Sequence, residues 1–409
     1  MTARRVNRER LWSALMEIGT IGETPDQGCR RLALSEQDAQ ARRVLTAWAS
    51  SAGCAVSQDA IGNLFLRRPG LNPDAPAVAM GSHLDTVHTG GKFDGVLGVI
   101  AGLEVMRVLN ESDIRTRAPV ELVVWTNEEG ARFSPMTMGS SVFVGDLALD
   151  VALAQKDAAG VSVSEALNES GLAGERRGSH PLAAYLELHV EQGPLLKEGG
   201  EAIGIVTGSF RAHYFVATIT GEAGHVGPTL MEHRRDAFAA AAELTIEIER
   251  IGRARGRQGR SNAPHVEVYP NARGVIPASV RLSCDLRHAD ANEVGRMEEE
   301  LRQAARDIAA RRGVSVALDP YFQFGPLACD GTMNDLIRRN ADALGLRHRD
   351  MLTVASHDAV PMMRFCPTAL FFVPSETGVS HNPAEFSTPQ QCSDGADLLL
   401  NAVLELSGA

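Results

Sequence analysis

Four apolar runs along this chain are typical of buried strands, and each one leads into polar residues. The runs cover residues 78–80, 121–126, 185–190 and 369–373. Helical patterns alternate with these strands, for example at residues 99–109 and 330–344. Such alternation is typical of a doubly wound α/β sheet, in which functional groups gather at the carboxyl ends of the strands. The pattern therefore predicts a doubly wound α/β domain with a site at those ends.

The spacing of hydrophobic positions changes after residue 208. It predicts strands and helices in the order βαββαβ, at residues 214–220, 232–254, 265–269, 279–287, 291–312 and 315–319. This order matches a ferredoxin-like domain. We therefore expect residues 209–325 to form an inserted domain, with residues 1–208 and 326–409 forming the two parts of the catalytic domain. The basic, glycine-containing segment at residues 252–260 is expected to be a solvated loop.

Length and composition agree with a cytoplasmic enzyme of two domains. A chain of 409 residues exceeds the size at which a single core usually divides, and a hydrophobic content of 44% is ample for packed cores. The formal charge of −11 gives no support for nucleic-acid binding. No apolar stretch approaches the roughly 20 residues of a membrane span, and the basic start lacks the apolar region of a secretion signal. Six scattered cysteines are expected to be reduced thiols.

The first candidate site follows the strand at residues 78–80. His83 and Asp85 point to the same side if the strand continues, so the Asp85 carboxylate could accept the second ring N–H of His83. Asp94 lies beyond a glycine-rich turn that allows the backbone to fold back. Imidazole nitrogen and carboxylate oxygen are ligands that Zn²⁺ takes up in hydrolytic sites. The segment therefore contains candidate metal ligands, although His83 and Asp85 could also be an ordinary hydrogen-bonded pair.

The other three strands lead into residues of the same kind. Glu128 and Glu129 follow the second strand, and these adjacent carboxylates repel each other unless a cation offsets their charge. His189 lies in the third strand, and His381 follows the fourth. Four such segments converging on one edge of a sheet favour a metal site over coincidence.

Six motifs in this sequence resemble those of one family. They read HLDT, FDGxLGVxAGLEV, NEEGARF, ELHVEQGP, GHVGPTxMxxRRDA and VSHNPAE. They resemble the amidohydrolase branch of the M20 metallopeptidases, which contains N-carbamoyl-L-amino acid hydrolases, β-ureidopropionase-like enzymes and allantoate amidohydrolases. The resemblance extends over about residues 21–399 and implies a zinc-peptidase-like catalytic domain.

The resemblance also implies roles for individual residues. Glu128 would be the general base, and Asp94 would bridge two divalent metal ions, with Zn²⁺ expected and Mn²⁺, Co²⁺ or Ni²⁺ as alternatives. The implied metal ligands are His83, Asp94, Glu129, His189 and His381.

Further residues are assigned to the substrate by the same resemblance. His225 would reach the active site of the partner subunit in a homodimer formed by the inserted domain, and would donate to the substrate carbonyl. Arg287 would bind the substrate carboxylate, as a planar guanidinium does well. Gln192 would contact the substrate, and Asn271 is a candidate, beside Arg273 or a water molecule, to replace a substrate contact that is missing at Gly274.

Three departures from the family pattern put the substrate in doubt. Gly274 stands where the family commonly has an asparagine that helps to hold the substrate. Arg211 and His213 lie in a run that is glycine-rich in typical members, so they face either the substrate or a packed surface. The pair His357 and Asp358 lacks the usual preceding glycine and is expected to support the pocket structurally.

The predicted activity is hydrolysis of a non-peptide C–N bond in a small ureido or amide substrate that carries a carboxylate. An N-carbamoyl-L-amino acid would give the amino acid, ammonia and carbon dioxide. Allantoate or ureidoglycolate amidohydrolysis would use the same residues. An N-acyl amino acid deacylase or dipeptidase would keep the metals and release no ammonia. From another class, a non-catalytic binding protein would have empty metal sites.

Overall fold

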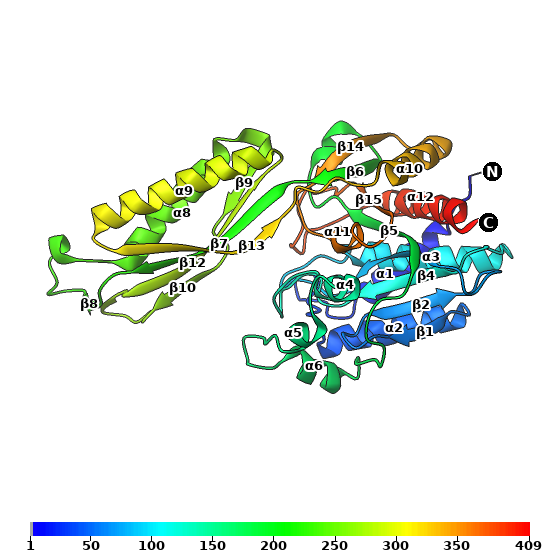
Figure 1. Ribbon diagram of the computed structural model, residues 1–409, viewed down its shortest axis with the longest axis horizontal. Helices are drawn as coiled ribbons and strands as arrows, with labels where there is room; N and C mark the ends of the chain where they lie inside the picture. The colour runs from blue at the N-terminus through cyan, green and yellow to red at the C-terminus, as the bar shows by residue number, and fades with distance from the viewer. Residues whose placement is uncertain (1–2) are drawn as a thin grey trace. The chain divides into compact units, whose positions relative to one another are not determined.

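The structure is a computed structural model, and it describes residues 3–409 (Figure 1). The described chain divides into two compact units. The large unit contains the described residues up to Thr207 together with Cys329–Met351 and Ser356–Ala409. The small unit contains Gly208–Ala328 and Leu352–Ala355.

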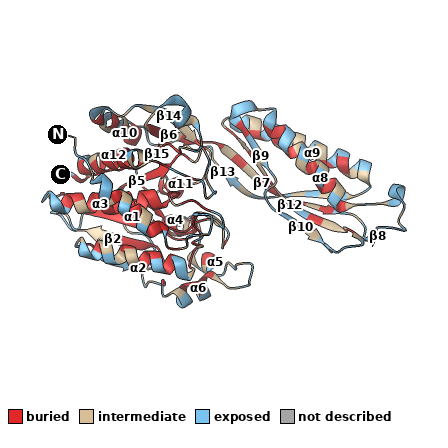
Figure 2. Ribbon diagram, turned by 180° about the vertical axis from the view of Figure 1, so that it is seen from behind, coloured by how far each residue is buried: buried red, intermediate tan, exposed pale blue. Residues whose placement is uncertain are grey.

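An eight-stranded mixed sheet forms the centre of the large unit, in the order β1-β2-β4-β3-β5-β15-β6-β14. Its strands are β1 (Ala55–Gln58), β2 (Leu64–Arg68), β3 (Ala77–His83), β4 (Val120–Trp125), β5 (Leu182–Val190), β6 (Ile203–Ser209), β14 (His348–Thr353) and β15 (Thr368–Val373). Strands β4, β3, β5 and β15 run parallel to their neighbours in this group. Figure 2 shows these central strands as almost entirely buried. Their near-continuous hydrophobic sequences follow from this, because both faces of the sheet are covered.

Helices pack on both faces of this sheet. The larger hydrophobic cluster takes Val78 and Met80 from one face of β3, while Ala77 and Ala79 on the opposite face belong to another cluster. The helices of the large unit are α1 (Arg8–Gly19), α2 (Glu36–Ser51), α3 (Val96–Glu111), α4 (Met138–Val144), α5 (Leu149–Leu153), α6 (Val163–Ser170), α7 (Leu195–Gly199), α10 (Gly331–Leu344), α11 (Ala359–Met362) and α12 (Pro389–Ser407). The large unit is therefore an α/β layered structure, as the sequence predicts.

The small unit has its own sheet and core. Its sheet has the order β10-β12-β7-β13, with β9 also pairing with β12, and all of these pairs are antiparallel. The elements are β7 (Arg211–Thr220), α8 (Ala237–Arg253), β9 (Gly259–Asn262), β10 (Val266–Tyr269), β12 (Ser279–His288), α9 (Ala291–Arg312) and β13 (Ser315–Phe324). Both helices cover one face of the sheet and share a hydrophobic core with it (Figure 1). A separate two-stranded ribbon joins β8 (Gly224–His225) to β11 (Val275–Ile276).

Three expectations about the small unit differ from the structure. The segment expected as a loop at residues 252–260 contains a 3-10 turn, Gly256–Gln258, and the start of β9. Arg255 in this segment is bound to Glu300 at 2.6 Å, so its charge is paired and not simply solvated. Helix α8 begins at Ala237 and not at residue 232, because Asp236 accepts hydrogen bonds from the first backbone N–H groups. Strand β13 continues to Phe324, beyond the expected end at residue 319.

Among the described residues, no helix has the length and apolar character needed to cross a membrane.

Candidate metal centre

The candidate metal ligands lie at the carboxyl ends of four adjacent strands. His83 is the last residue of β3, and His189 is the penultimate residue of β5. Glu129 follows β4, and His381 follows β15. Because β4, β3, β5 and β15 are neighbours with parallel pairings, their carboxyl ends meet at one edge of the sheet. The sequence prediction that these four segments converge is confirmed.

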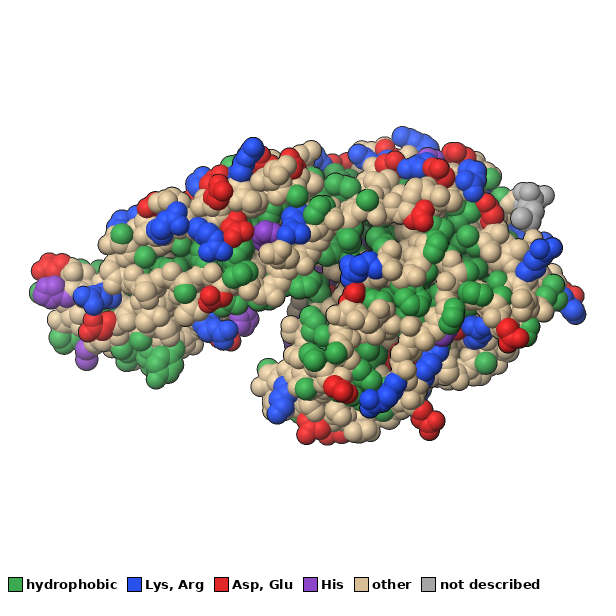
Figure 3. Space-filling model, in the orientation of Figure 1, with side chains coloured by type: hydrophobic (Ala, Val, Ile, Leu, Met, Phe, Trp, Pro, Cys, Tyr) green, Lys and Arg blue, Asp and Glu red, His purple; other side chains and the backbone are tan. Residues whose placement is uncertain are grey.

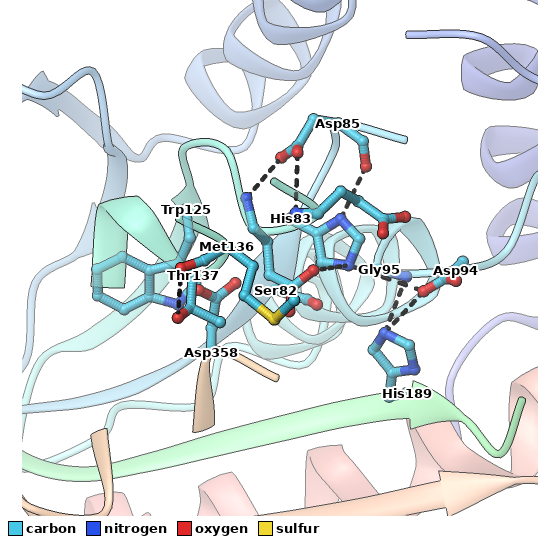
Figure 4. A network of polar contacts seen from close by, with 12 residues as sticks. Ser82, His83, Asp85, Asp94, Gly95, Trp125, Met136, Thr137, His189 and Asp358 are labelled. Carbon is cyan, nitrogen blue, oxygen red and sulfur yellow. Dashed lines mark hydrogen bonds and ion pairs between the residues drawn. The ribbon is translucent and has the colours of Figure 1, made fainter. Parts of the chain in front are cut away.

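One group of ligands consists of His83, Asp94 and His189 (Figure 4). The Nε2 atoms of His189 and His83 lie 3.0 and 3.7 Å from Oδ1 of Asp94. The Nδ1 atom of His83 lies 2.8 Å from the backbone carbonyl of Asp85, and that of His189 lies 2.9 Å from the carbonyl of Val190. A carbonyl oxygen can only accept, so Nδ1 carries the proton in both rings. This leaves both Nε2 atoms facing Asp94, as metal-binding imidazoles require.

The second group consists of Asp94, Glu129 and His381. The Nε2 atom of His381 lies 3.5 Å from Oδ2 of Asp94 and 3.3 Å from Oε2 of Glu129. Asp94 therefore faces one group with each carboxylate oxygen. In each group the ligand atoms lie within 4.8 Å of one another. Imidazole nitrogens and carboxylate oxygens in this number and spacing fit a pair of divalent ions of the zinc type.

The Asp85 carboxylate does not make the contact with His83 that the sequence predicts. The backbone carbonyl of Asp85, and not its carboxylate, accepts the ring N–H of His83. The carboxylate instead accepts the backbone N–H groups of Glu128 and Glu129, each at 3.2 Å. The prediction was wrong because β3 ends at His83, so the alternation of a strand does not extend to Asp85. Asp85 still connects the end of β3 to the segment after β4.

Glu128 lies beside the first group without belonging to either group. Its Oε2 is 3.5 Å from Nε2 of His83, and its side chain is buried. Burial raises the pKa of Glu128 well above the ordinary range, and the negative charges of Asp358 and Glu129 raise it further. A buried carboxyl group with a raised pKa beside candidate metal ligands suits the proton transfers of a general base and acid.

Two imidazoles of the cluster are stabilised in their charged form by the carboxylates around them. Burial by itself lowers the pKa of His189, but the hydrogen bond and charge of Asp94 outweigh it and raise the pKa to about 9. The same competition, with Asp94 and Glu129 as partners, raises the pKa of His381 to about 11. Protons therefore occupy the positions at which a divalent ion would bind, and an ion must displace them.

Two hydrogen-bond donors approach Asp94 from the side of the second group. Gln192, predicted to face the substrate, donates from Nε2 to Oδ2 of Asp94 at 2.8 Å. The hydroxyl of Ser380 lies 2.9 Å from the same oxygen. Gln192 thus lies at the cluster, and so does Ser380, which belongs to the VSHNPAE motif but was assigned no role there.

His357 and Asp358 lie closer to the cluster than their predicted supporting role requires. The His357 ring packs against the His189 ring with centroids 4.4 Å apart, and its buried Nε2 has no hydrogen-bond partner. Glu187, His189 and His357 form a further group of metal-type side chains. Oδ1 of Asp358 accepts a hydrogen bond from Ser140 at 2.5 Å, whereas Oδ2 has none. The position of Glu187 two residues before His189 in β5 was the available sequence signal.

The predicted substrate residue His225 belongs to the small unit, whereas the residues of the cluster belong to the large unit. Its side chain is exposed, and its Nδ1 accepts a hydrogen bond from the backbone N–H of Gly227 at 3.1 Å. The ring proton is therefore on Nε2, which points away from this contact.

Arg287 also belongs to the small unit and is held by groups of that unit. Its Nε and Nη2 bind the carboxylate of Asp285 at 2.9 and 2.6 Å. Its Nη1 donates to the carbonyl of Val354 at 2.8 Å, and its guanidinium lies 5.5 Å from the ring centre of Tyr214. These contacts fix the direction in which the guanidinium points.

The remaining residues in question lie in the small unit too. Asn271 is exposed with a φ of 51°. Gly274 has a φ of 83°, and a Cβ atom added to it would meet no heavy atom within 4 Å. Arg211 donates from Nε to Nε2 of His213 at 3.0 Å, and Nδ1 of His213 lies 3.0 Å from Glu298. Arg211 and His213 are thus paired with each other and with α9, which favours the packed surface over contact with a substrate.

The chain matches peptidase family M20/M25/M40 over residues 79–405. It is 39% identical over 407 residues to an N-carbamoyl-L-amino acid amidohydrolase of Geobacillus stearothermophilus, a match that covers 98% of this chain and 99% of the relative. It is 37% identical over 403 residues to an N-carbamoyl-L-amino-acid amidohydrolase of Rhizobium meliloti, covering 98% and 97% of the two chains.

A solved structure is similar over the same extent. It is an amidase of the hydantoinase/carbamoylase family from Burkholderia vietnamiensis, 41% identical in sequence, with a TM-score of 0.96. The match covers 100% of this chain and 99% of that one.

Proposed function

This chain belongs to peptidase family M20/M25/M40, and we propose that it is a metal-dependent amidohydrolase that cleaves the carbamoyl C–N bond of an N-carbamoyl-L-amino acid. Family membership confirms the resemblance drawn from the sequence motifs. The observation that carries the proposal is the pair of ligand groups that share Asp94, with the buried carboxyl of Glu128 beside them. The similar relatives support the carbamoyl substrate.

Two divalent ions would be held by the two groups, with Asp94 as the shared ligand. His83, Asp94 and His189 would hold one ion, and Asp94, Glu129 and His381 the other. When bound, such ions supply a water molecule of lowered pKa and polarise the scissile carbonyl. Zn²⁺ is the expected ion, because the donor set of nitrogen and carboxylate oxygen suits it.

Glu128 would move the proton during the reaction. It is buried beside the first group, and it is free to accept a proton because the second group uses Glu129 instead. Glu128 would take a proton from the attacking water and then give it to the leaving nitrogen. The products would be the free amino acid, ammonia and carbon dioxide.

Arg287 would anchor the substrate carboxylate. A guanidinium has five N–H groups. Asp285 takes one from Nε and one from Nη2, and Val354 takes one from Nη1. One N–H therefore remains on each terminal nitrogen, and this pair matches a carboxylate. Gln192, which donates to Asp94, and the exposed Asn271 are the further proposed substrate contacts.

The small unit would be a ferredoxin-like dimerisation domain. Its chain order, β7-α8-β10-β12-α9-β13, and its sheet order support that fold. Exposed apolar residues lie on its edge strand β10, at Val266 and Tyr269, and on α8, at Phe238 and Ile246. Figure 3 shows apolar side chains gathered on part of this unit. A homodimer formed there would let His225, whose Nε2 carries a proton, donate to the substrate carbonyl in the partner's active site.

The charge of −11 and six unpaired cysteines support a cytoplasmic location for this enzyme.

Ammonia release tests the proposed reaction most simply. N-carbamoyl-L-amino acids, allantoate, ureidoglycolate and N-acyl amino acids would be supplied in turn, with Zn²⁺, Mn²⁺, Co²⁺ and Ni²⁺ added separately. We expect ammonia from the N-carbamoyl-L-amino acids. Preferential hydrolysis of allantoate or ureidoglycolate would replace the proposed substrate, and hydrolysis without ammonia would indicate a deacylase or dipeptidase. A protein that binds no metal and hydrolyses none of these would be a binding protein.

A further inference from the structure

Glu385 connects two segments that each supply a metal-type ligand. It is only 4% exposed and lies in the loop after β15, four residues beyond His381. Its Oε1 accepts hydrogen bonds from the backbone N–H groups of Phe93 and Asp94, at 3.1 and 3.0 Å. The carboxyl group therefore holds the backbone of the turn that presents Asp94, from a point almost three hundred residues later in the chain.

The second oxygen of Glu385 acts on the Asp94 side chain through a hydroxyl group. Oε2 makes a short hydrogen bond with Oγ of Ser380. The same Oγ lies 2.9 Å from Oδ2 of Asp94, which is the oxygen that faces the second group. Glu385 thus holds the backbone of Asp94 directly and, through Ser380, holds one of the contacts of its Oδ2 atom.

The sequence leaves room for this contact at one glycine. A Cβ atom on Gly91 would lie 2.3 Å from Oε1 of Glu385. Any other residue at position 91 would therefore push the carboxyl group away from the turn. Gly91 belongs to the glycine-rich turn that lets the chain fold back, and it is also required for the approach of Glu385.

His381 depends on the same loop for its position. It lies between Ser380 and Glu385, both of which make hydrogen bonds to Asp94. Its own φ is 53°, a backbone conformation that residues with a side chain rarely adopt. Its side chain is 50% exposed, so packing around the ring does little to hold it. By contrast, His83 and His189 are almost fully buried and lie on strands whose pairing fixes them.

We propose that Glu385 is a positioning residue that holds Asp94 and His381 in place for the second metal ion. This rests on the proposed dinuclear site. Without Glu385, the first ion keeps two imidazoles that are fixed by β3 and β5, whereas the second loses the anchor of two of its three ligands. The effect on the two ions should therefore be unequal.

Metal affinity measured by competition with a chromophoric chelator tests this without any substrate. Zn²⁺ would be titrated into the metal-free full chain and into the variants Glu385→Ala and Glu385→Gln. We expect the wild type to bind two ions. Glu385→Ala should bind one ion within a few-fold of its normal affinity and the other about 10–100-fold more weakly. Glu385→Gln should retain both within a few-fold, because its amide can accept from the two N–H groups and donate to Ser380.

A matched control separates positioning from loss of a buried carboxyl group in general. Asp397 is 2% exposed and accepts the backbone N–H of Val6 at 2.7 Å, with no contact to the cluster. Asp397→Ala should lower the free energy of unfolding and leave both metal affinities unchanged. Equal metal loss in Asp397→Ala and Glu385→Ala would overturn the proposal, as would equal loss in Glu385→Gln and Glu385→Ala.

Normal affinity for both ions in a folded Glu385→Ala variant would also overturn it. If that variant does not fold, Ser380→Ala removes only the hydroxyl that joins Glu385 to Asp94. It should weaken the second ion in the same direction by a smaller factor, and unchanged affinity for both ions there would contradict the proposal. Fewer than two ions in the wild type would overturn the dinuclear site itself, and this inference with it.

Discussion

The Asp94 carboxylate divides its two oxygens between different partners. Oδ1 lies 3.0 Å from Nε2 of His189, and Oδ2 lies 3.5 Å from Nε2 of His381. Glu128 and Glu129, although adjacent, separate in the same way, since only Glu129 joins a ligand group. The backbone N–H groups of both glutamates bind the Asp85 carboxylate, which fixes the segment that presents them. Neighbouring carboxylates can therefore take different roles.

The first prediction separates those two roles. Glu128→Gln should keep about the normal metal content and lose about 10²–10⁴-fold in kcat, because it removes proton transfer and leaves the ligands intact. Glu129→Gln should lower the metal content itself, since it removes a ligand. Metal analysis of the purified variants and steady-state kinetics provide the two measurements. Metal loss in Glu128→Gln, or normal content in Glu129→Gln, would mean that the roles are assigned wrongly.

The second prediction concerns pH and metal binding. In the metal-free chain the pKa of His189 is raised to about 9 and that of His381 is also raised, so both are protonated at neutral pH. A metal ion binds the deprotonated imidazole, and it must displace these protons. The metal affinity should therefore rise as the pH is raised from about 6.5 to about 9, with proton release on binding.

Calorimetry in buffers of different ionisation enthalpy would count the released protons. Chelator competition at several pH values would give the affinity. An affinity that is the same across this range, with no proton release, would contradict the assignment of the histidines as ligands.

At the scale of the elements, α3 starts beside the metal centre and depends on one glycine. Gly95 precedes the helix with a φ of 70°, and a Cβ atom there would lie 2.4 Å from the ring of His83. The backbone nitrogen of Gly95 also lies 3.2 Å from Nε2 of His189. The start of the helix is thus packed directly against two predicted ligands.

The third prediction is that Gly95→Ala displaces His83 and weakens binding of the first ion. The variant should also lose about 1–3 kcal/mol of unfolding free energy, because a strained backbone is combined with a clash. Gly145→Ala is the matched control, since Gly145 has a φ of 88° and open space around it. The unfolding free energy of that variant should fall only by what a left-handed backbone costs alanine, about 1–2 kcal/mol. Its metal affinity should be normal. Equal metal affinity in the two variants would contradict the packing argument.

Elements with a strong hydrophobic period could be predicted from the sequence with good boundaries. Helix α9 covers Ala291–Arg312, the predicted range, because its apolar positions repeat regularly between Asp290 and Gly313. Strand β9 could not be predicted, since Gly259–Asn262 contains no apolar residue and forms a strand only by pairing with β12. Pairing of this kind is a tertiary contact, which local periodicity does not contain.

The candidate site, like the fold, could be predicted from the sequence only in part. Residues at strand ends, such as His83 and His189, could be placed because parallel strands bring their ends together. The Asp85 carboxylate could not, because its direction depends on where β3 stops. Glu385 could not be placed from the spacing either, since its partners Phe93 and Asp94 are brought to it only by the fold.

For the whole molecule, the proposed dimer implies that each active site needs residues from two chains. Glu128 would serve the metal centre of its own chain, whereas His225 would serve that of the partner. The fourth prediction follows by mixing Glu128→Gln chains with His225→Ala chains, neither of which is active alone. A mixed dimer contains one site with both defects and one with neither, so random exchange should restore about one quarter of wild-type sites.

Subunit exchange must be shown independently, by labelled chains. If exchange occurs and no activity returns, His225 acts within its own chain or has no part in catalysis. As a reference, wild-type chains would be mixed in the same way with chains that carry both substitutions. In that mixture only the wild-type homodimers contain intact sites.

The central claim is that hydrolysis of an N-carbamoyl-L-amino acid requires both ligand groups to hold an ion. Ammonia release would be measured while the metal-free enzyme is titrated with Zn²⁺, with bound metal determined in the same samples. We expect little activity at one ion per chain and a plateau at two, because the water and the carbonyl need both ions. Full activity at one bound ion per chain, or no ammonia from any N-carbamoyl-L-amino acid at two, would contradict the claim.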